Sequence, residues 1–340
     1  MTVAPGRELP AVAEGVRDWL RSRGRHVSIA SCDRPSDGLS SDTIMLTLRD
    51  DGGREEGLVV RLAPPGPGAF PEYDLDQQVT AQGLAAANGV PVAAPAELVT
   101  DERWLGAPFV AMPAVAGHVP GSVPLVDRWV TDSSRAARSR MYDAFVDVLA
   151  RIHSSTFVDT ADLPLRHLDG ELAYWQRYLD WCADGERVVP ALWSALDWCR
   201  VTRPSEEPEP VLLWGDVRLG NVIFDDDRRV AAVLDWEMAG LGPPEHDVAW
   251  WRTLEATQDE LFGRRVDGFP QPSESLARYE AAVGRSMCDL GWYEVFALVR
   301  SSAVMTRIAF LQEAAGSPPL FPIADNPLVP LIERRIDALS

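Results

Sequence analysis

Residues 213–251 decide the fold of this chain; they read LWGDVRLGNVIFDDDRRVAAVLDWEMAGLGPPEHDVAWW. Four residues separate Asp216 from Asn221, and two short apolar runs follow the loop that carries them. The turn residues 225–228 between these runs predict a β-hairpin, and Asp235 comes directly after it. A loop before a hairpin and the exit of that hairpin lie side by side. We therefore expect Asp216, Asn221 and Asp235 to meet at one site.

These residue types suit phosphoryl transfer, which needs a carboxylate to orient the attacking hydroxyl and oxygen ligands to hold Mg²⁺ against nucleotide phosphates. The D-x-x-x-x-N spacing is that of a kinase catalytic loop. Alone it occurs by chance, and an Asp after an apolar strand is often a turn or cap residue. Its placement around a hairpin, with the small Gly215 and Gly220 in the loop, makes the prediction more specific.

The sequence around this segment predicts two units of different character. The first is rich in strands, with helices over 10–22 and 72–88 and strands over 26–32, 43–49, 57–63, 96–100 and 107–112. The second is mainly helical, with long patterns over 133–155, 170–183, 189–201, 274–285, 289–313 and 327–338. We place the boundary near Met112-Pro113, which gives an N-terminal lobe of residues 1–112 and a C-terminal lobe of residues 113–340; the family resemblance described below implies that the first of these binds the nucleotide.

Composition and charge narrow the function classes. The 340 residues are 46% hydrophobic and 24% charged, as in ordinary globular proteins. Lys and Arg number 32 against 51 Asp and Glu, so the net charge of −19 disfavours nucleic acid as a partner. Charged residues interrupt every long apolar stretch, so neither a signal peptide nor a membrane partner is expected. The four cysteines are scattered, which favours reduced thiols in the cytoplasm over a zinc site.

Segment 213–251 resembles the aminoglycoside phosphotransferase-like family, in the branch with the pattern WGD-x-R-x-GN…AVLDWEMA-x-LGP…DVAW. The resemblance implies an α+β, bilobal, protein-kinase-like fold with a small β-rich N-terminal lobe. It also implies an enzyme that transfers the γ-phosphate of ATP or GTP, with Mg²⁺, to a hydroxyl of a small molecule. An aminoglycoside-type antibiotic or a related hydroxylated metabolite would be that acceptor, so resistance to an antibiotic is one expected role.

Residue by residue, the resemblance makes Asp216 the catalytic base and Asn221 and Asp235 the Mg²⁺ ligands. Arg218 would contact phosphate, although an ordinary surface ion pair explains it equally well. Asp247 would support the catalytic loop through hydrogen bonds. Two nearby carboxylates that could meet a substrate are more simply solvated or capping residues; they are Glu237 and Glu245.

In the N-terminal lobe, the resemblance implies a phosphate-covering loop between two strands, formed by Ser36, Gly38, Ser40, Ser41 and their neighbours. Arg61 would take the place of the kinase lysine. Met112 would link the lobes and offer its backbone to the purine, with a core methionine as the alternative.

The chain departs from the family pattern twice. Trp214 replaces a histidine before the Gly-Asp pair, which would remove a polar support of the loop. The usual glutamate partner of the kinase lysine is replaced by Gln78 or Thr80, so Arg61 would pair elsewhere, with Asp74 or Asp76, or grip phosphate more loosely.

These departures keep a nucleotide-binding pseudokinase with a regulatory role open. A hydrolase that uses Asp216 and Asp235 as a carboxylate pair is a third hypothesis, but it leaves Asn221 unexplained. The acceptor is also open: macrolides, choline- or homoserine-like metabolites and hydroxyacyl compounds are further candidates. A cationic antibiotic could meet residues that at helical spacing are also typical of a core and its flanks, namely Trp175, Tyr178, Asp180, Trp181, Asp184 and Glu186.

Overall fold

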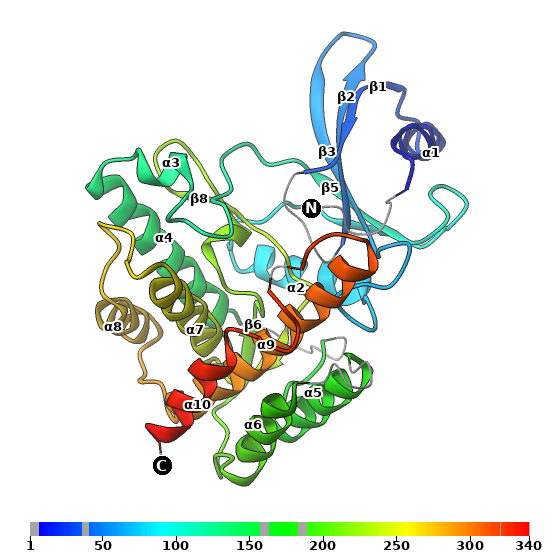
Figure 1. The fold of residues 1–340 in the computed structure, drawn as a ribbon. Coiled ribbons are helices and arrows are strands. Elements are labelled where there is room, and N and C mark those ends of the chain that lie inside the picture. The colour runs from blue at the N-terminus through cyan, green and yellow to red at the C-terminus, as the bar shows by residue number, and fades with distance from the viewer. Residues whose placement is uncertain (1–6, 36–40, 157–162, 183–188, 320, 340) are drawn as a thin grey trace.

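A computed structural model describes residues 7–35, 41–156, 163–182, 189–319 and 321–339. It confirms the predicted bilobal α+β fold: one antiparallel sheet dominates the N-terminal part, and helices dominate the rest (Figure 1). The predicted helices and strands are present, most with ends shifted by one to three residues. Within the described ranges, no helix combines the length and the apolar character needed to cross a membrane.

The N-terminal sheet has five strands in the order β1-β2-β3-β5-β4, and every neighbouring pair is antiparallel. Its strands are β1 (Val27–Asp33), β2 (Asp42–Asp50), β3 (Glu55–Leu62), β4 (Glu97–Val99) and β5 (Phe109–Pro113). Helix α1 (Leu9–Ser22) packs beside β1, and Val16 of its apolar stripe belongs to the same buried cluster as Ile44 and Leu46 of the sheet. Helix α2 (Leu75–Ala87) packs near β4 and β5, where Met112 is buried. The sheet is therefore anchored by one helix near each end.

The helical part is organised around α9 (Leu290–Ala314), which contacts four other helices. Most of its side chains are buried, which explains why its sequence is apolar on nearly every face. The surrounding helices are α3 (Arg128–Thr131), α4 (Arg135–His153), α5 (Leu168–Cys182), α6 (Pro190–Val201), α7 (Glu245–Phe262), α8 (Pro272–Val283) and α10 (Val329–Asp337). Trp175 and Tyr178 of α5 belong to this core, as their helical spacing indicates.

Four short strands lie where the catalytic loop is expected. The predicted hairpin is present as β7 (Val222–Phe224) and β8 (Val230–Val233). Strand β6 (Val211–Leu213) pairs with β9 (Gly240–Gly242), a pairing that the sequence pattern does not predict. A Cβ atom at position 240 would lie 2.5 Å from Nε of Arg166 and 2.9 Å from the carbonyl oxygen of Pro164, so glycine permits the close approach of β9 to this segment.

The sequence pattern also does not predict α7. Its first turn buries the three polar residues Glu245, His246 and Asp247, which hides the amphipathic period by which a helix is recognised.

A cluster of buried polar side chains lies where α9 meets α5 and α7. His246 and Arg300 are 3% and 4% exposed, and Nη1 of Arg300 lies 3.5 Å from Nδ1 of His246. Burial and the charge of Arg300 lower the pKa of His246 to about 3. Burial acts against the charge of Glu171, but Arg166 and Arg300 lower the pKa of this carboxyl to about 2. His246 is therefore neutral and Glu171 ionised at neutral pH.

The histidine makes a prediction about acid stability. Because the folded protein holds His246 with a pKa below its unfolded value of about 6.5, its contribution to stability is complete above that pH. The contribution is lost as the pH falls from about 6.5 towards 3. Because of this histidine, the free energy of unfolding should fall by about 1.4 kcal/mol for each unit by which the pH is lowered in that window.

Urea unfolding at pH 7, 6, 5 and 4 measures this slope. The variant His246→Gln should show a shallower slope than the wild type, whereas His26→Gln, at an exposed position, should not. Equal slopes for wild type and His246→Gln would contradict the assignment.

Candidate active site

Asp216 lies in the loop between β6 and β7, just before a 3₁₀ turn over Leu219–Asn221. Nδ2 of Asn221 donates to Oδ2 of Asp216 at 2.7 Å and to its backbone oxygen at 2.9 Å. Nε1 of Trp250 donates to Oδ1 of Asp216 at 2.9 Å. The two ends of the D-x-x-x-x-N motif therefore meet, and both oxygens of Asp216 are held in place.

Arg218 completes the surroundings of Asp216. Its Nε donates to Oδ2 of Asp216 at 2.9 Å, and its Nη1 lies 3.3 Å from Oγ of Ser122. Burial would raise the pKa of Asp216, but the charge and hydrogen bond of Arg218, with those from Trp250 and Asn221, lower it overall. Asp216 is thus an oriented carboxylate. Arg218 forms an ion pair with this carboxylate, and its contact with phosphate stays a prediction.

Asp247, in the first turn of α7, holds the catalytic loop. Its Oδ2 accepts from the amide of Trp214 at 2.6 Å, and its Oδ1 accepts from the amide of Gly215 at 3.0 Å. Nε2 of His153 lies 3.1 Å from Oδ2, and Nδ1 of the same ring lies 2.5 Å from the hydroxyl of Tyr279. The support expected from Asp247 thus extends through His153 to α8.

Trp214 corrects an expectation. The loss of a histidine before Gly215 was expected to remove a polar support, but Nε1 of Trp214 donates to the carbonyl of Leu234 at 2.7 Å. This bond joins the catalytic loop to the residue before Asp235. The indole is fully buried, so the donor is supplied by a larger ring that also fills the core.

Position 215 requires glycine for two reasons, its backbone conformation and the close approach of Met238. Its φ is +93°, a conformation that side chains disfavour. A Cβ atom here would lie 2.3 Å from the carbonyl oxygen of Met238. The catalytic loop and the segment after Asp235 are therefore packed backbone against backbone.

Asp235 follows β8 with a φ of +63°, in the left-handed region. Its Oδ1 accepts from Nη2 of Arg61 at 2.7 Å, and the same Nη2 lies 3.0 Å from Oγ of Ser41. Oε2 of Glu237 lies 3.6 Å from Arg61 and accepts from Ser41 at 3.1 Å. Arg61 on β3 and Ser41 beside β2 thus meet two carboxylates from the helical part of the chain.

This arrangement identifies the partner of Arg61, which is neither residue proposed from α2. Asp74 caps α2 by accepting from the amide of Gln77, and Nε2 of Gln77 reaches the carbonyl of Ala239 at 2.6 Å. Burial opposes the charge of Arg61, but Asp235 and Glu237 raise the pKa of its guanidinium. The expected pairing with Asp74 or Asp76 is therefore wrong. The reason is that the lobes meet at this point, which the sequence alone does not indicate.

The two glutamates expected to be solvated or capping residues are both buried. The side chain of Glu237 is 8% exposed and faces Arg61 and Ser41. Glu245 is fully buried and pairs with Arg285 and with the amide of Cys288. Glu237 is therefore part of the site, whereas Glu245 secures the start of α7.

The remaining predicted positions divide into two groups. Ser36, Gly38 and Ser40 lie outside the described residues. Met112 is buried in β5 beside Val110 and Ala93, and its contact with a purine stays a prediction. Trp250 was missed, although it follows Asp247 by three residues and so continues one face of α7.

The donor set fits a hard divalent cation. Both hydrogen bonds of the Asn221 amide use its nitrogen, so its oxygen is the atom that can face a metal. The carboxylate of Asp235 already holds a positive group, the guanidinium of Arg61. Amide and carboxylate oxygens are ligands that Mg²⁺ accepts, with phosphate oxygens and water completing the shell. Among the described residues, no group of three or more His, Cys, Asp or Glu is placed to hold a metal without such help.

Comparison with known proteins adds the decisive observation. The model of the phosphotransferase enzyme family matches residues 31–280, from β1 to α8. The chain belongs to this family. A putative aminoglycoside phosphotransferase from Ralstonia eutropha superposes with a TM-score of 0.71 over 96% of this chain and 98% of that one, at 23% identity.

Two further proteins similar to this phosphotransferase family member carry different names, one of an antibiotic kinase and one of an acyl-CoA dehydrogenase. Aminoglycoside phosphotransferase APH(4)-Ia, solved with ADP and hygromycin B, gives a TM-score of 0.57 at 15% identity, covering 94% of this chain and 98% of that one. Acyl-CoA dehydrogenase family member 11 of Pongo abelii is 28% identical over 233 residues, or 65% of this chain. This chain spans 29% of the length of that protein.

The indole bond of Trp214 makes a prediction about stability. Trp214→Phe keeps an aromatic ring but leaves the buried carbonyl of Leu234 without its donor. We expect a loss of about 1–3 kcal/mol of unfolding free energy, measured by urea denaturation. Trp198→Phe is the matched control, because no hydrogen bond to its indole nitrogen is found among the described residues and the ring is half-buried. A loss no larger than that of the control would refute the role of the bond.

Proposed function

We propose that this protein is a Mg²⁺-dependent kinase that transfers the γ-phosphate of ATP or GTP to a hydroxyl group of a small molecule. The observation that carries the proposal is the meeting of three groups from distant parts of the chain. Asp216 with Asn221, Asp235 with Arg61, and Ser41 of the loop between β1 and β2 supply the base, the metal ligands and the phosphate contacts of one site.

In this proposal the oriented carboxylate of Asp216 accepts the hydrogen bond of the acceptor hydroxyl. The hydroxyl oxygen forms a bond to the γ-phosphorus, the bond from that phosphorus to the bridging oxygen breaks, and the nucleoside diphosphate leaves. The hydroxyl proton passes to Asp216 and then to solvent. Asn221 and Asp235 would hold Mg²⁺, which neutralises phosphate charge when it is bound. Arg61, Arg218 and Ser41 would donate hydrogen bonds to phosphate oxygens.

A small acceptor is supported by the short connection between Asp235 and Asp247. Eleven residues separate them (247 − 235 − 1), and three of these form β9 while the last two begin α7. Protein kinases dock peptides on a long segment at this place. The residues left here are too few for such a platform, so a protein acceptor is disfavoured.

The two lobes would divide the work of the kinase. We propose that residues 1–112 bind the nucleotide and that residues 113–340 supply the catalytic loop and the acceptor site.

We also propose that the protein is located in the cytoplasm. Cys182 and Cys199 are buried free thiols and Cys288 is an exposed one, which suits this reducing compartment.

One observation favours a second candidate, a nucleotide-binding pseudokinase. The guanidinium of Arg61 lies against Asp235, where the metal would bind, so this contact must be exchanged before catalysis. The names of the acyl-CoA dehydrogenase relatives also make a hydroxyacyl metabolite an alternative to an antibiotic as acceptor. An assay of phosphoryl transfer distinguishes the kinase from the pseudokinase. The acceptor screen below distinguishes a hydroxyacyl metabolite from an antibiotic.

Nucleotide binding is the first test. With ATP or GTP and millimolar Mg²⁺, the protein should gain about 2.7 kcal/mol of stability when the ligand is a hundredfold above its Kd. Asp235→Ala should lose most of that gain, because it removes a metal ligand. Asp226→Ala, in the exposed hairpin turn, is the control and should keep it. No thermal shift of the wild type with either nucleotide would refute both the kinase and the pseudokinase.

Turnover is the second test. Labelled ATP and GTP are incubated with a panel of hydroxylated metabolites, aminoglycosides and macrolides, and with generic protein substrates. A small molecule should be labelled, and Asp216→Asn should lower its turnover by roughly 10²- to 10⁴-fold while nucleotide binding is kept. Labelling of proteins but of none of the small molecules would overturn the proposal, and near-wild-type turnover of Asp216→Asn would remove its base.

A further inference from the structure

Arg300, in the middle of α9, is a buried charge that has no role in the site described above. Its side chain is 4% exposed, and its Nε atom has no hydrogen-bond partner among the described residues. Three aromatic rings surround the guanidinium: its central carbon lies 5.0 Å from the ring centre of Trp250, 5.4 Å from that of Trp175 and 5.8 Å from that of Phe296. Such contacts favour a cation but do not satisfy its hydrogen bonds.

No carboxylate of the described residues lies within ion-pair distance, 4.0 Å, of Arg300. The carboxylate that acts most on its charge, Glu171, is hydrogen-bonded by Nη1 of Arg166 at 2.9 Å, and Asp247 acts on that charge as well. Among the described residues, the polar contact of Arg300 is with His246, a neutral ring at 3.5 Å. The charge of Arg300 is therefore compensated only at a distance, because neither carboxylate forms an ion pair with it. Burying a charge without a full partner costs free energy, so its presence here calls for an explanation.

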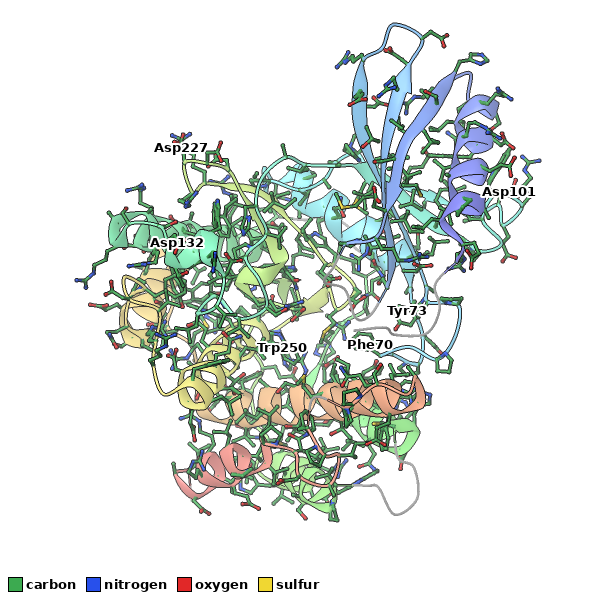
Figure 2. All side chains as sticks on the ribbon, turned by 45° about the horizontal axis from the view of Figure 1, so that its top comes forward. Phe70, Tyr73, Asp101, Asp132, Asp227 and Trp250 are labelled. Atoms are coloured by element: carbon green, nitrogen blue, oxygen red, sulfur yellow. The ribbon has the colours of Figure 1, made fainter. Side chains whose placement is uncertain are left out.

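The position of Arg300 supplies that explanation. The ring that stacks on its guanidinium, Trp250, donates its Nε1 to Oδ1 of Asp216 at 2.9 Å. Arg300 therefore lies one indole away from the carboxylate that would orient the acceptor hydroxyl. Figure 2 shows Trp250, Phe70 and Tyr73 together between the five-stranded sheet and α9.

A second arginine continues the same face of α9. Arg307 follows Arg300 by seven residues, two turns along the helix. Its Nε donates to the carbonyl of Gly68 at 3.0 Å, and its guanidinium lies 4.2 Å from the ring centre of Trp181 on α5. Burial raises the pKa of Tyr73 to about 12. Two arginines, Arg300 and Arg307, therefore lie along this face of α9.

We infer that Arg300 binds an anionic group, a carboxylate or a phosphate ester, on the acceptor, and that the enzyme selects hydroxylated anions over amines. This inference rests on the proposed kinase function, since it names the class of molecule that the same site phosphorylates. A polycationic antibiotic would need carboxylates at the place where α9 presents Arg300 and Arg307. The net charge of −19 belongs to the whole chain and does not by itself place a carboxylate where an amine of the acceptor would bind.

The test uses probes that differ in charge but share a hydroxyl. One set is mandelate, mandelamide and phenylethanolamine, which are anionic, neutral and cationic; a second pair is glycerol phosphate and glycerol. Binding of each probe to the wild-type protein is measured by thermal shift and tryptophan fluorescence, with Mg²⁺ and a non-hydrolysable ATP analogue present. Phosphorylation is measured separately with ATP. We expect the anionic member of at least one set to bind roughly 10- to 100-fold more tightly than its neutral partner.

Three variants assign this preference to a residue. Arg300→Gln should reduce it to within about twofold, and Arg300→Lys should keep part of it, since the charge remains without the planar fork. Arg278→Gln on α8, whose exposed arginine pairs with Asp143 and Asp147, is the matched control and should keep it fully. Circular dichroism and cooperative melting show which variants fold. If Arg300→Gln does not fold, Arg300→Lys and the wild-type probe series still decide.

The outcomes separate the inference from the proposed function. Preference for anions that depends on Arg300, with phosphorylation, supports both. The same preference in binding without any phosphorylation supports the anion site and refutes the kinase. Phosphorylation or binding in which amines equal or exceed the anions, no preference in either set, or a preference unchanged in Arg300→Gln, overturns the inference and leaves the kinase standing if transfer is seen.

Discussion

The active site depends on a single carboxylate, that of Asp247, which accepts hydrogen bonds from two successive amides. Because Trp214 and Gly215 are both bound, the chain direction at the next residue is fixed, and Asp216 points where Asn221 and Trp250 reach it. Burying this charge is tolerable because three donors surround it, the third being the ring of His153. The hydrogen bonds tie α4, α7 and α8 to the loop that would perform the chemistry.

The parts of the fold that the sequence predicts are those set by near neighbours in the chain. The hairpin of β7 and β8 follows from its turn, and the contact of Asp216 with Asn221 follows from their spacing. The pairing of β6 with β9 and the ion pair of Arg61 with Asp235 depend on segments far apart, so no local pattern reveals them. The same is true of Glu237, whose buried state depends on how the two lobes meet.

Total charge and local charge give different indications in this protein. An excess of acidic residues suits a cationic acceptor, and the aromatic residues of α5 could have formed its binding surface. Trp175 and Tyr178 are instead buried in the core, and the charged side chain that packs on Trp175 is Arg300. Acidic residues spread over an exposed surface act mainly through solvent and are screened by salt. In the inference above, the buried guanidinium of Arg300, one indole away from Asp216, has a larger effect on which molecule binds.

Each of the two central carboxylates forms an ion pair with an arginine, Asp216 with Arg218 and Asp235 with Arg61. Arg218 helps to keep the pKa of Asp216 below its usual range. Arg61 joins the two parts of the chain, because its Nη2 contacts both Asp235 and Ser41. A metal-bound nucleotide would bring positive charge to Asp235 and negative charge to Arg61 at once. The two partners would then separate without either losing a counter-charge, so the ion pair would not oppose binding of the nucleotide.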